Sequence, residues 1–312
     1  MMKAIVIEQY GNKDQLIEKE MKYPVPKENQ VIVEMHATSI NPIDWKLREG
    51  YLKEMLDFDF PIILGWDAAG VVTEVGAAVT NFSEGDRVFA RPETTRFGTY
   101  AEYTAIDEHL LAHLPENISF EEAAAVPLAG LTARQCLVDF ADIKAGDRVL
   151  IHAGSGGVGH YAIQIAKQKG AYVATTASGK NKEWVENLGV DRFINYKEED
   201  FSEVISDFDI VLDTIGGDVQ EKSFKVLREG GRLPSIVQPP DEKLAEEHEV
   251  KAGFEWLEPS GEKLSSLAKM MEEGELTSVI GHQFDFTEKG LKEAHDLSET
   301  HHAKGKIVIK IK

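Results

Sequence analysis

The sequence contains a single cysteine, Cys136, among its 312 residues. One cysteine cannot form an intrachain disulfide, and it cannot provide the several thiolates of a multi-cysteine metal site, so its expected role is packing. The chain also lacks an apolar run of about 18 residues, the length that spans a bilayer. Residues 1–10 lack the apolar core of a signal peptide. These absences predict a cytoplasmic protein without a membrane partner.

Basic residues are scarce relative to acidic ones. The chain has 34 lysines and arginines against 54 aspartates and glutamates, which gives a formal net charge of −20. A surface of this sign repels nucleic-acid phosphates and anionic lipids, so we expect no nucleic-acid partner. The hydrophobic fraction of 42% and the charged fraction of 28% are ordinary for a globular protein, and the length suits two domains.

A glycine-rich turn lies between an expected strand at 149–151 and an expected amphipathic helix at 158–170. Gly154 permits the tight turn, Gly156 lets the backbone approach a pyrophosphate, and Gly159 lets the helix pack closely on the sheet. The free N–H groups at the start of the helix would face the anion. In this strand–turn–helix context the motif predicts dinucleotide binding, and an ordinary glycine-rich turn is the alternative.

The expected elements divide the chain into two parts. Before residue 121, short strands separated by glycine, proline and asparagine predict a β-rich domain. From residue 149 onward, strands alternate with helices, which predicts a doubly wound parallel sheet with its ligand at the carboxyl ends of the strands. The expected strands there are 149–151, 171–176, 192–195, 209–213 and 232–237, and the helices are 158–170, 182–188 and 219–227. A helix at 260–273 and strands at 276–281 and 306–311 close the chain.

Five motifs carry a resemblance to a known family: 41–44 (NPID), 85–88 (GDRV), 98–103 (GTYAEY), 131–133 (LTA) and 152–159 (HAGSGGVG). Together they resemble the medium-chain dehydrogenase/reductase superfamily. Within it, the chain is similar to the zinc-free quinone oxidoreductase branch, which includes NADPH:quinone reductases and alkenal or enone reductases. The resemblance extends over essentially the whole chain.

This resemblance implies an α/β fold in which a Rossmann doubly wound parallel sheet is inserted into a GroES-like β-barrel catalytic domain. It assigns 1–121 and 260–312 to the catalytic domain and 122–259 to the NADPH-binding Rossmann domain, with the active site in the cleft between them. Members of the family commonly form homodimers through the edge of the Rossmann sheet. Here the alternating apolar stretch 252–257 is the expected edge strand.

The resemblance also implies that no metal is bound. Zinc-dependent relatives have a ligand cysteine where this chain has Asn41, and a Gly-His-Glu run where it has Gly65, Trp66 and Asp67. Their four-cysteine structural lobe is replaced by the direct run of 91–98. The histidines at 295, 301 and 302 lie in a polar C-terminal context, so we expect them at the surface.

The stretch 175–182 (TTASGKNK) indicates which nicotinamide cofactor is used. NAD-specific folds place an acidic residue about 20 residues after the glycine turn, where it binds the ribose 2′-hydroxyl. Hydroxyl and ammonium groups stand here instead and favour the 2′-phosphate of NADPH. By resemblance, the cofactor-binding residues are Asn41, Asp44, Thr132, Gly154, Ser155, Gly156, Gly157, Val158, Ser178, Lys182, Tyr196, Thr214 and Val237. Asp44 either orients its loop or binds ribose.

A hydride acceptor that is not activated by zinc must be activated by conjugation, hydrogen bonds and positioning. Quinones meet this need and are the first expected substrates, and α,β-unsaturated aldehydes and ketones are the alternative. A third reading is an NADPH-binding protein with little turnover. Tyr51 is the candidate catalytic proton donor, although the second tyrosine common in related proteins is replaced here by Lys46. A tyrosine that packs or lines the cleft is the alternative.

Overall fold

The chain folds into two compact units, which a computed structural model describes over residues 1–312. One unit is Met1–Leu128 together with Pro259–Lys312, and the other is Ala129–Glu258. No helix in either unit combines the length and the apolar character needed to cross a membrane. Cys136 is buried, which agrees with the packing role expected for it.

The unit Ala129–Glu258 is built on a six-stranded sheet with the order β11-β10-β9-β12-β13-β14. Every neighbouring pair is parallel. The strands are β9 (Arg148–Ile151), β10 (Tyr172–Ala177), β11 (Arg192–Asn195), β12 (Phe208–Leu212), β13 (Leu227–Ser235) and β14 (Lys251–Phe254). The chain starts at the centre, proceeds to one edge, and then returns to build the other half. This order confirms the expected doubly wound Rossmann sheet.

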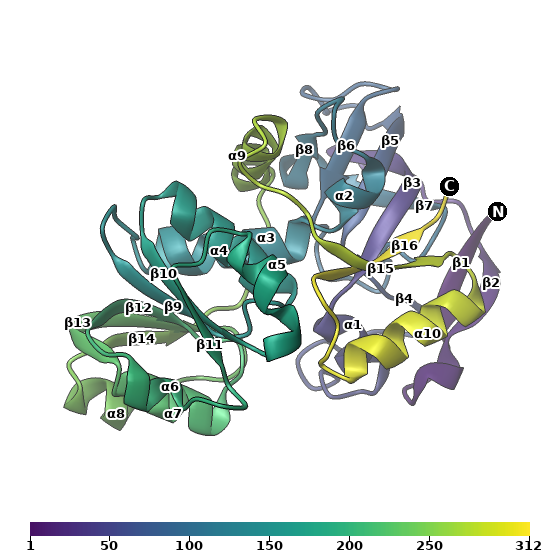
Figure 1. Cartoon of the computed structure of the whole chain (residues 1–312). Helices are drawn as coiled ribbons and strands as arrows, with labels where there is room; N and C mark the ends of the chain where they lie inside the picture. Colours follow the sequence, from purple (N-terminus) through teal and green to yellow (C-terminus); the bar gives the residue numbers. More distant parts are fainter. The chain divides into compact units, whose positions relative to one another are not determined.

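Helices cover both faces of this sheet, because central strands such as β9 are apolar and buried on both sides. In Figure 1, α4 and α5 lie on one side of the sheet, and α6, α7 and α8 on the other. The helices are α3 (Pro127–Arg134), which begins before this unit and continues into a π-helical segment (Gln135–Phe140), α4 (Gly157–Gln168), α5 (Lys182–Glu186), α6 (Phe201–Val204), α7 (Gly217–Phe224) and α8 (Glu242–Glu247).

The other unit contains a seven-stranded sheet, β15-β16-β3-β5-β6-β8 with β7 paired to β3, and a three-stranded sheet, β2-β1-β4. Its strands are β1 (Met2–Ile7), β2 (Ile17–Met21), β3 (Gln30–Ile40), β4 (Ile62–Ile63), β5 (Ala68–Val75), β6 (Arg87–Ala90), β7 (Tyr103–Asp107), β8 (Leu111–His113), β15 (Ile280–Asp285) and β16 (Lys306–Lys310). Its helices are α1 (Pro42–Arg48), α2 (Phe120–Ala124), α9 (Gly261–Glu272) and α10 (Glu288–Glu299).

The end of the chain returns to this first unit, as the family resemblance implies. Strand β16 pairs antiparallel with β3, with Ile307 opposite Ile40 and Ile309 opposite Thr38 (Figure 1). Ile307 and Ile309 are buried in the same apolar core as Ile40 and Trp66. This pairing brings Lys306 beside the carboxyl end of β3, where the candidate site begins.

Two expectations for the C-terminal region are wrong. The strand expected at 276–281 lies at Ile280–Asp285, and α10 was not expected at all. His295 on α10 is fully buried rather than exposed, because Arg48 Nη1 lies 3.0 Å from its Nδ1 and Tyr100 Oη 3.1 Å from its Nε2. Burial, with a smaller effect of Arg48, lowers the pKa of His295 to about 3, so the ring is neutral at physiological pH.

Candidate cofactor and active site

Steric contacts fix the glycine turn between β9 and α4. A Cβ added at Gly154 would lie 2.1 Å from Thr175 Oγ1, and one added at Gly159 would lie 2.3 Å from the Ala153 carbonyl oxygen. Ala153 itself has a φ of 50°, and its N–H donates to Thr176 Oγ1 at 3.2 Å. The chain's own packing therefore excludes a side chain at both glycines.

Gly156 is different, because its surroundings are more open. An added Cβ would meet only the Ala153 carbonyl oxygen, at 3.3 Å. Gly156 is the N-cap of α4, no side chain caps this helix, and its first turn contains no acidic residue. The first N–H groups of a helix have no partner within the helix, and they carry its positive end. This helix start therefore fits the pyrophosphate of a nicotinamide dinucleotide.

The predicted residues of the Rossmann unit follow the carboxyl ends of five neighbouring parallel strands. The motif residues Gly154 to Val158 follow β9, Ser178 follows β10, Tyr196 follows β11, Thr214 follows β12, and Val237 lies two residues after β13. Carboxyl ends of parallel strands meet at one edge of a sheet, so these positions share that edge. Thr132 is the exception, because it is buried within α3.

The predicted adenosine end combines one buried hydroxyl with exposed lysines. Ser178 precedes a short 3₁₀ turn and is almost fully buried, whereas Tyr196 is 52% exposed. The Lys182 ammonium lies 3.8 Å from Glu186 Oε1, and both side chains are largely solvated. An exposed pair at this distance contributes little free energy, so the ammonium is free to bind a phosphate. No acidic residue lies between β10 and Lys182.

We expect Lys182→Ala to weaken NADPH binding roughly 10- to 100-fold while scarcely changing NADH binding, because only NADPH carries the 2′-phosphate. Lys182→Glu should discriminate more strongly, because it adds repulsion. The measurement is kcat/KM with each cofactor at one ionic strength, with the exposed Lys169→Ala as the matched control. Equal losses for both cofactors would show that Lys182 does not contact the 2′-phosphate.

In the other unit, Asn41 and Asp44 form the turn between β3 and α1. Asp44 Oδ2 accepts hydrogen bonds from the Asn41 backbone N–H and the Tyr100 hydroxyl, both at 2.8 Å. Asp44 Oδ1 is buried and has no hydrogen-bond partner. Burial raises the pKa of Asp44 to about 7, against the opposing effect of these hydrogen bonds. The contacts favour the first role predicted for Asp44, which is to orient its loop.

The Asn41 side chain lies between two buried charges that the sequence did not predict as site residues. Its Nδ2 donates to Asp67 Oδ2 at 2.7 Å, and its Oδ1 accepts from the Lys306 ammonium at 2.5 Å. Asp67 Oδ2 also accepts from Ser39 Oγ at 2.6 Å, and Asp67 Oδ1 accepts from the Leu128 N–H at 2.8 Å. Lys306 was not predicted as a site residue, because a lysine at the start of an apolar strand ordinarily lies in solvent.

The residues around Asn41 do not fit a zinc ion. The Asn41 amide oxygen already faces an ammonium group, and Trp66 Nε1–H is a donor without a lone pair, bonded to the Thr95 carbonyl oxygen at 3.2 Å. No group of three or more histidine, cysteine, aspartate or glutamate side chains in residues 1–312 could hold a metal. At Asn41, one of the positions compared with a zinc ligand in the sequence analysis, the side chain binds the Lys306 ammonium, so a cation already occupies this place.

Tyr51 lies just after α1, is 69% exposed, and is not part of the Asn41–Asp44 network. A hydrogen bond with Glu49 raises the pKa of its phenol, so the hydroxyl keeps its proton at neutral pH. Its assignment as proton donor stays a prediction.

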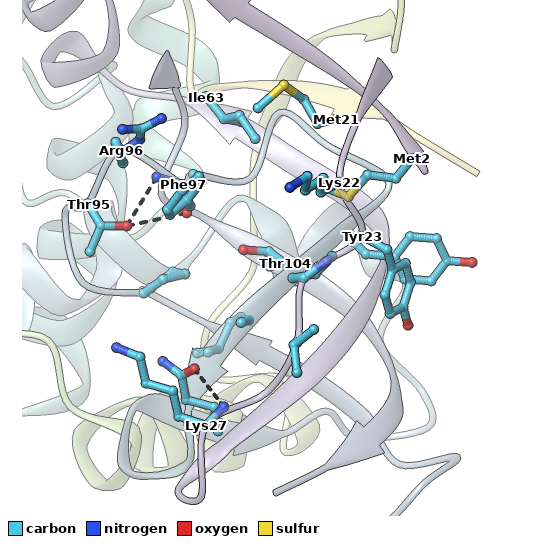
Figure 2. A pocket seen from close by; sticks show the side chains of 18 of the residues that line it. Met2, Met21, Lys22, Tyr23, Lys27, Ile63, Thr95, Arg96, Phe97 and Thr104 are labelled. Atoms are coloured by element: carbon cyan, nitrogen blue, oxygen red, sulfur yellow. Dashed lines mark hydrogen bonds between the residues drawn. The ribbon is translucent and has the colours of Figure 1, made fainter. Parts of the chain in front are cut away.

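A cavity of about 760 Å³ in the same unit contains none of the predicted residues. It lies along β7 and the segments 20–25 and 95–98. Figure 2 shows the side chains of Met2, Met21 and Phe97 around it, with Lys22 nearby. The cavity is therefore a feature of this unit that the sequence did not indicate.

Comparison with known proteins shows to which family the chain is similar. The profile of the alcohol dehydrogenase GroES-like domain matches residues 27–116, and that of the zinc-binding dehydrogenase family matches residues 188–309. An NADPH-dependent alkenal/one oxidoreductase of Arabidopsis thaliana is 37% identical over 99% of this chain and 79% of its own length. A chloroplast envelope quinone oxidoreductase homolog of the same plant is 32% identical over 99% of this chain and 98% of its own length.

Two solved structures agree with this placement. The quinone oxidoreductase from Coxiella burnetii is 38% identical, with a TM-score of 0.91 over 100% of this chain and 99% of that chain. The Escherichia coli quinone oxidoreductase, solved as a complex with NADPH, is 26% identical, with a TM-score of 0.88 over 99% of this chain and 100% of that chain. Sequence and fold thus agree over the whole length, and the chain belongs to the medium-chain dehydrogenase/reductase family, in its quinone oxidoreductase branch.

Proposed function

We propose that the chain is an NADPH-dependent, zinc-independent oxidoreductase that transfers hydride to quinones, with α,β-unsaturated aldehydes and ketones as the second candidate class. The observation that carries the proposal is the start of α4, which no side chain caps, together with the segment after β10, which carries Ser178 and Lys182 and no acidic residue between them. The names of the relatives support both acceptor classes: two are an alkenal/one oxidoreductase and a 2-methylene-furan-3-one reductase, and others are quinone oxidoreductases.

The chain's residues would hold the cofactor by three kinds of contact. The N–H groups at the start of α4 bind the pyrophosphate, and Lys182 pairs with the 2′-phosphate while Ser178 and Tyr196 flank it. Thr214 and the backbone near Val237 line the path toward the nicotinamide, which Thr132 orients. When bound, NADPH supplies the hydride. Residues 1–121 and 260–312 would then act as the catalytic domain, and 122–259 as the cofactor domain.

A conjugated acceptor suits the residues around Asn41, because they include no metal ligands. Reduction of a quinone or an enone places negative charge on an oxygen atom. Directed hydrogen-bond donors stabilise such an oxyanion, most strongly where water is excluded. Asn41 can donate a hydrogen bond, and Tyr51 is the proposed source of the proton that completes the reduction.

A panel of acceptors tests this function. NADPH oxidation is followed with 1,4-benzoquinone, with but-3-en-2-one, and with butan-2-one as the saturated control, before and after dialysis against a strong chelator. We expect turnover with the quinone or the enone, none with the saturated ketone, and no loss on chelation. NADPH binding without turnover on any acceptor would favour the binding-protein alternative. A loss that zinc restores would contradict the metal-free mechanism.

We also propose a cytoplasmic homodimer. Strand β14 forms one edge of the Rossmann sheet; its last residue, Phe254, is 39% exposed, and Trp256, two residues further on, is 47% exposed. An exposed edge with apolar side chains is a natural surface for pairing with a second copy. Light scattering at micromolar concentration should report a dimer that Trp256→Lys converts to monomers. A wild-type monomer would contradict this proposal.

A further inference from the structure

The Lys306 ammonium is a buried cation, because the residue is only 3% exposed. Its Nζ donates to Asn41 Oδ1 and to the Ile40 carbonyl oxygen at 3.2 Å, and lies 3.6 Å from Asp67 Oδ2. Burial lowers the pKa of Lys306, and the nearby Asp67 opposes this shift. A buried charge is tolerated only when it is paired and hydrogen-bonded. This lysine is therefore placed by specific contacts with Asn41 and Asp67.

These two charges fix which way the Asn41 amide points. Its oxygen faces the ammonium of Lys306, and its nitrogen faces the carboxylate of Asp67. The reversed amide would place NH₂ against the ammonium and oxygen against the carboxylate, so both contacts would become repulsive. An amide nitrogen carries two hydrogens, and Asp67 uses one of them. The second N–H of Asn41 is thus held as a donor of fixed orientation.

The fixed orientation of the Asn41 amide indicates which oxygen atom accepts its second hydrogen bond. A ribose hydroxyl both donates and accepts, so it could bind either end of the amide. The nicotinamide carboxamide has a donor end and an acceptor end and can also adapt. The oxygen of a quinone, or of an enone that is gaining charge, only accepts hydrogen bonds. Only this last partner requires an amide that cannot reverse.

We propose that Lys306 and Asp67 are positioning residues that lock the Asn41 amide, so that its free N–H donates to the carbonyl oxygen of the hydride acceptor. This inference rests on the proposed function and deepens it. Asn41 is 2% exposed, so the donor acts in surroundings with little water, where a hydrogen bond to a developing oxyanion is strong. Lys306 acts through Asn41 and does not itself touch the acceptor.

A double-mutant cycle tests the lock. Lys306→Met keeps the length of the side chain and removes the charge. We expect kcat to fall about 10-fold, which is less than the ~10²–10³-fold loss caused by removing such a donor, because Asn41 is still present but no longer held in one orientation. The KM for NADPH should change less than about 3-fold, because the contact concerns the acceptor. In an Asn41→Ala background, Lys306→Met should cause no further loss. Lys310→Met, on the same strand but exposed, is the matched control.

A readout without cofactor accompanies the cycle. The side-chain NH₂ of Asn41 is observed by NMR in the protein labelled with ¹⁵N-asparagine and assigned with Asn41→Ala. Lys306→Met should move this pair of resonances, and Lys310→Met should leave it in place. If Lys306→Met does not fold, Asp67→Asn removes the other anchor and enters the same cycle.

The outcomes separate the lock from the proposed function. Wild-type enzyme without turnover on any acceptor overturns the proposed function, whatever the NMR shows. Turnover in the wild type, with losses from Lys306→Met that multiply with those of Asn41→Ala, overturns the lock alone. An Asn41 NH₂ pair that does not respond to Lys306→Met also overturns the lock.

Discussion

Gly159→Ala should abolish measurable NADPH binding and lower the free energy of unfolding by about 1–3 kcal/mol, the usual cost of overpacking. The added Cβ would lie 2.3 Å from the Ala153 carbonyl oxygen and 2.7 Å from Gly154 Cα, so the start of α4 must move away from the sheet. That movement displaces the N–H groups that we assign to the pyrophosphate. NADPH titration by fluorescence and unfolding in urea measure the two effects.

Gly156→Ala is the matched partner of this variant. Its Cβ would meet only the Ala153 carbonyl oxygen at 3.3 Å, so the stability of the fold should change little. NADPH affinity should still fall about 10- to 100-fold, the value of a hydrogen bond to a charged group, because the methyl group occupies the space that the pyrophosphate needs. Unchanged affinity would show that the pyrophosphate lies elsewhere. A Gly159→Ala protein with native stability and affinity would contradict the packing argument.

Asn41→Ala should lower kcat about 10²- to 10³-fold, the loss found when one directed donor to an oxyanion is removed. It should also cost about 1–3 kcal/mol of stability, because Lys306 and Asp67 lose a buried hydrogen-bond partner. The measurements are kcat and KM for the acceptor and for NADPH, together with urea unfolding. Asn117→Ala, which changes an exposed asparagine of the same unit, is the control.

The pattern of losses decides what Asn41 does. A fall in kcat with a nearly unchanged KM for NADPH agrees with a donor to the acceptor. A raised KM for NADPH with kcat unchanged would assign Asn41 to cofactor binding alone, and would contradict the proposed lock.

The sequence predicted well those features that depend on local geometry. The glycine turn was recognised because Gly154 and Gly159 meet steric limits set by residues nearby in the chain and by the adjacent strand β10. The alternation of strands and helices then predicted a doubly wound parallel sheet, but not the order of its strands. The positions of Ser178 and Thr214 after strands of this sheet could be predicted for the same reason.

The sequence did not predict the buried polar contacts, because they join residues far apart in the chain. Lys306 reaches Asn41 only after β16 pairs with β3, and Asp67 comes from a third segment. His295 was expected in solvent because polar neighbours surround it in sequence, yet Arg48 and Tyr100 satisfy its ring nitrogens. Composition cannot reveal a polar residue whose partners lie more than 190 positions away.

The central claim, an NADPH-dependent reductase of conjugated acceptors, is tested most directly by one comparison. The value of kcat/KM is measured for NADPH and for NADH with the same quinone or enone, at one ionic strength and after chelation. The account predicts a preference for NADPH of at least about 10-fold, because one charge-assisted contact to the 2′-phosphate contributes roughly 1.5–3 kcal/mol. A preference for NADH, or equal values for the two cofactors, would contradict it.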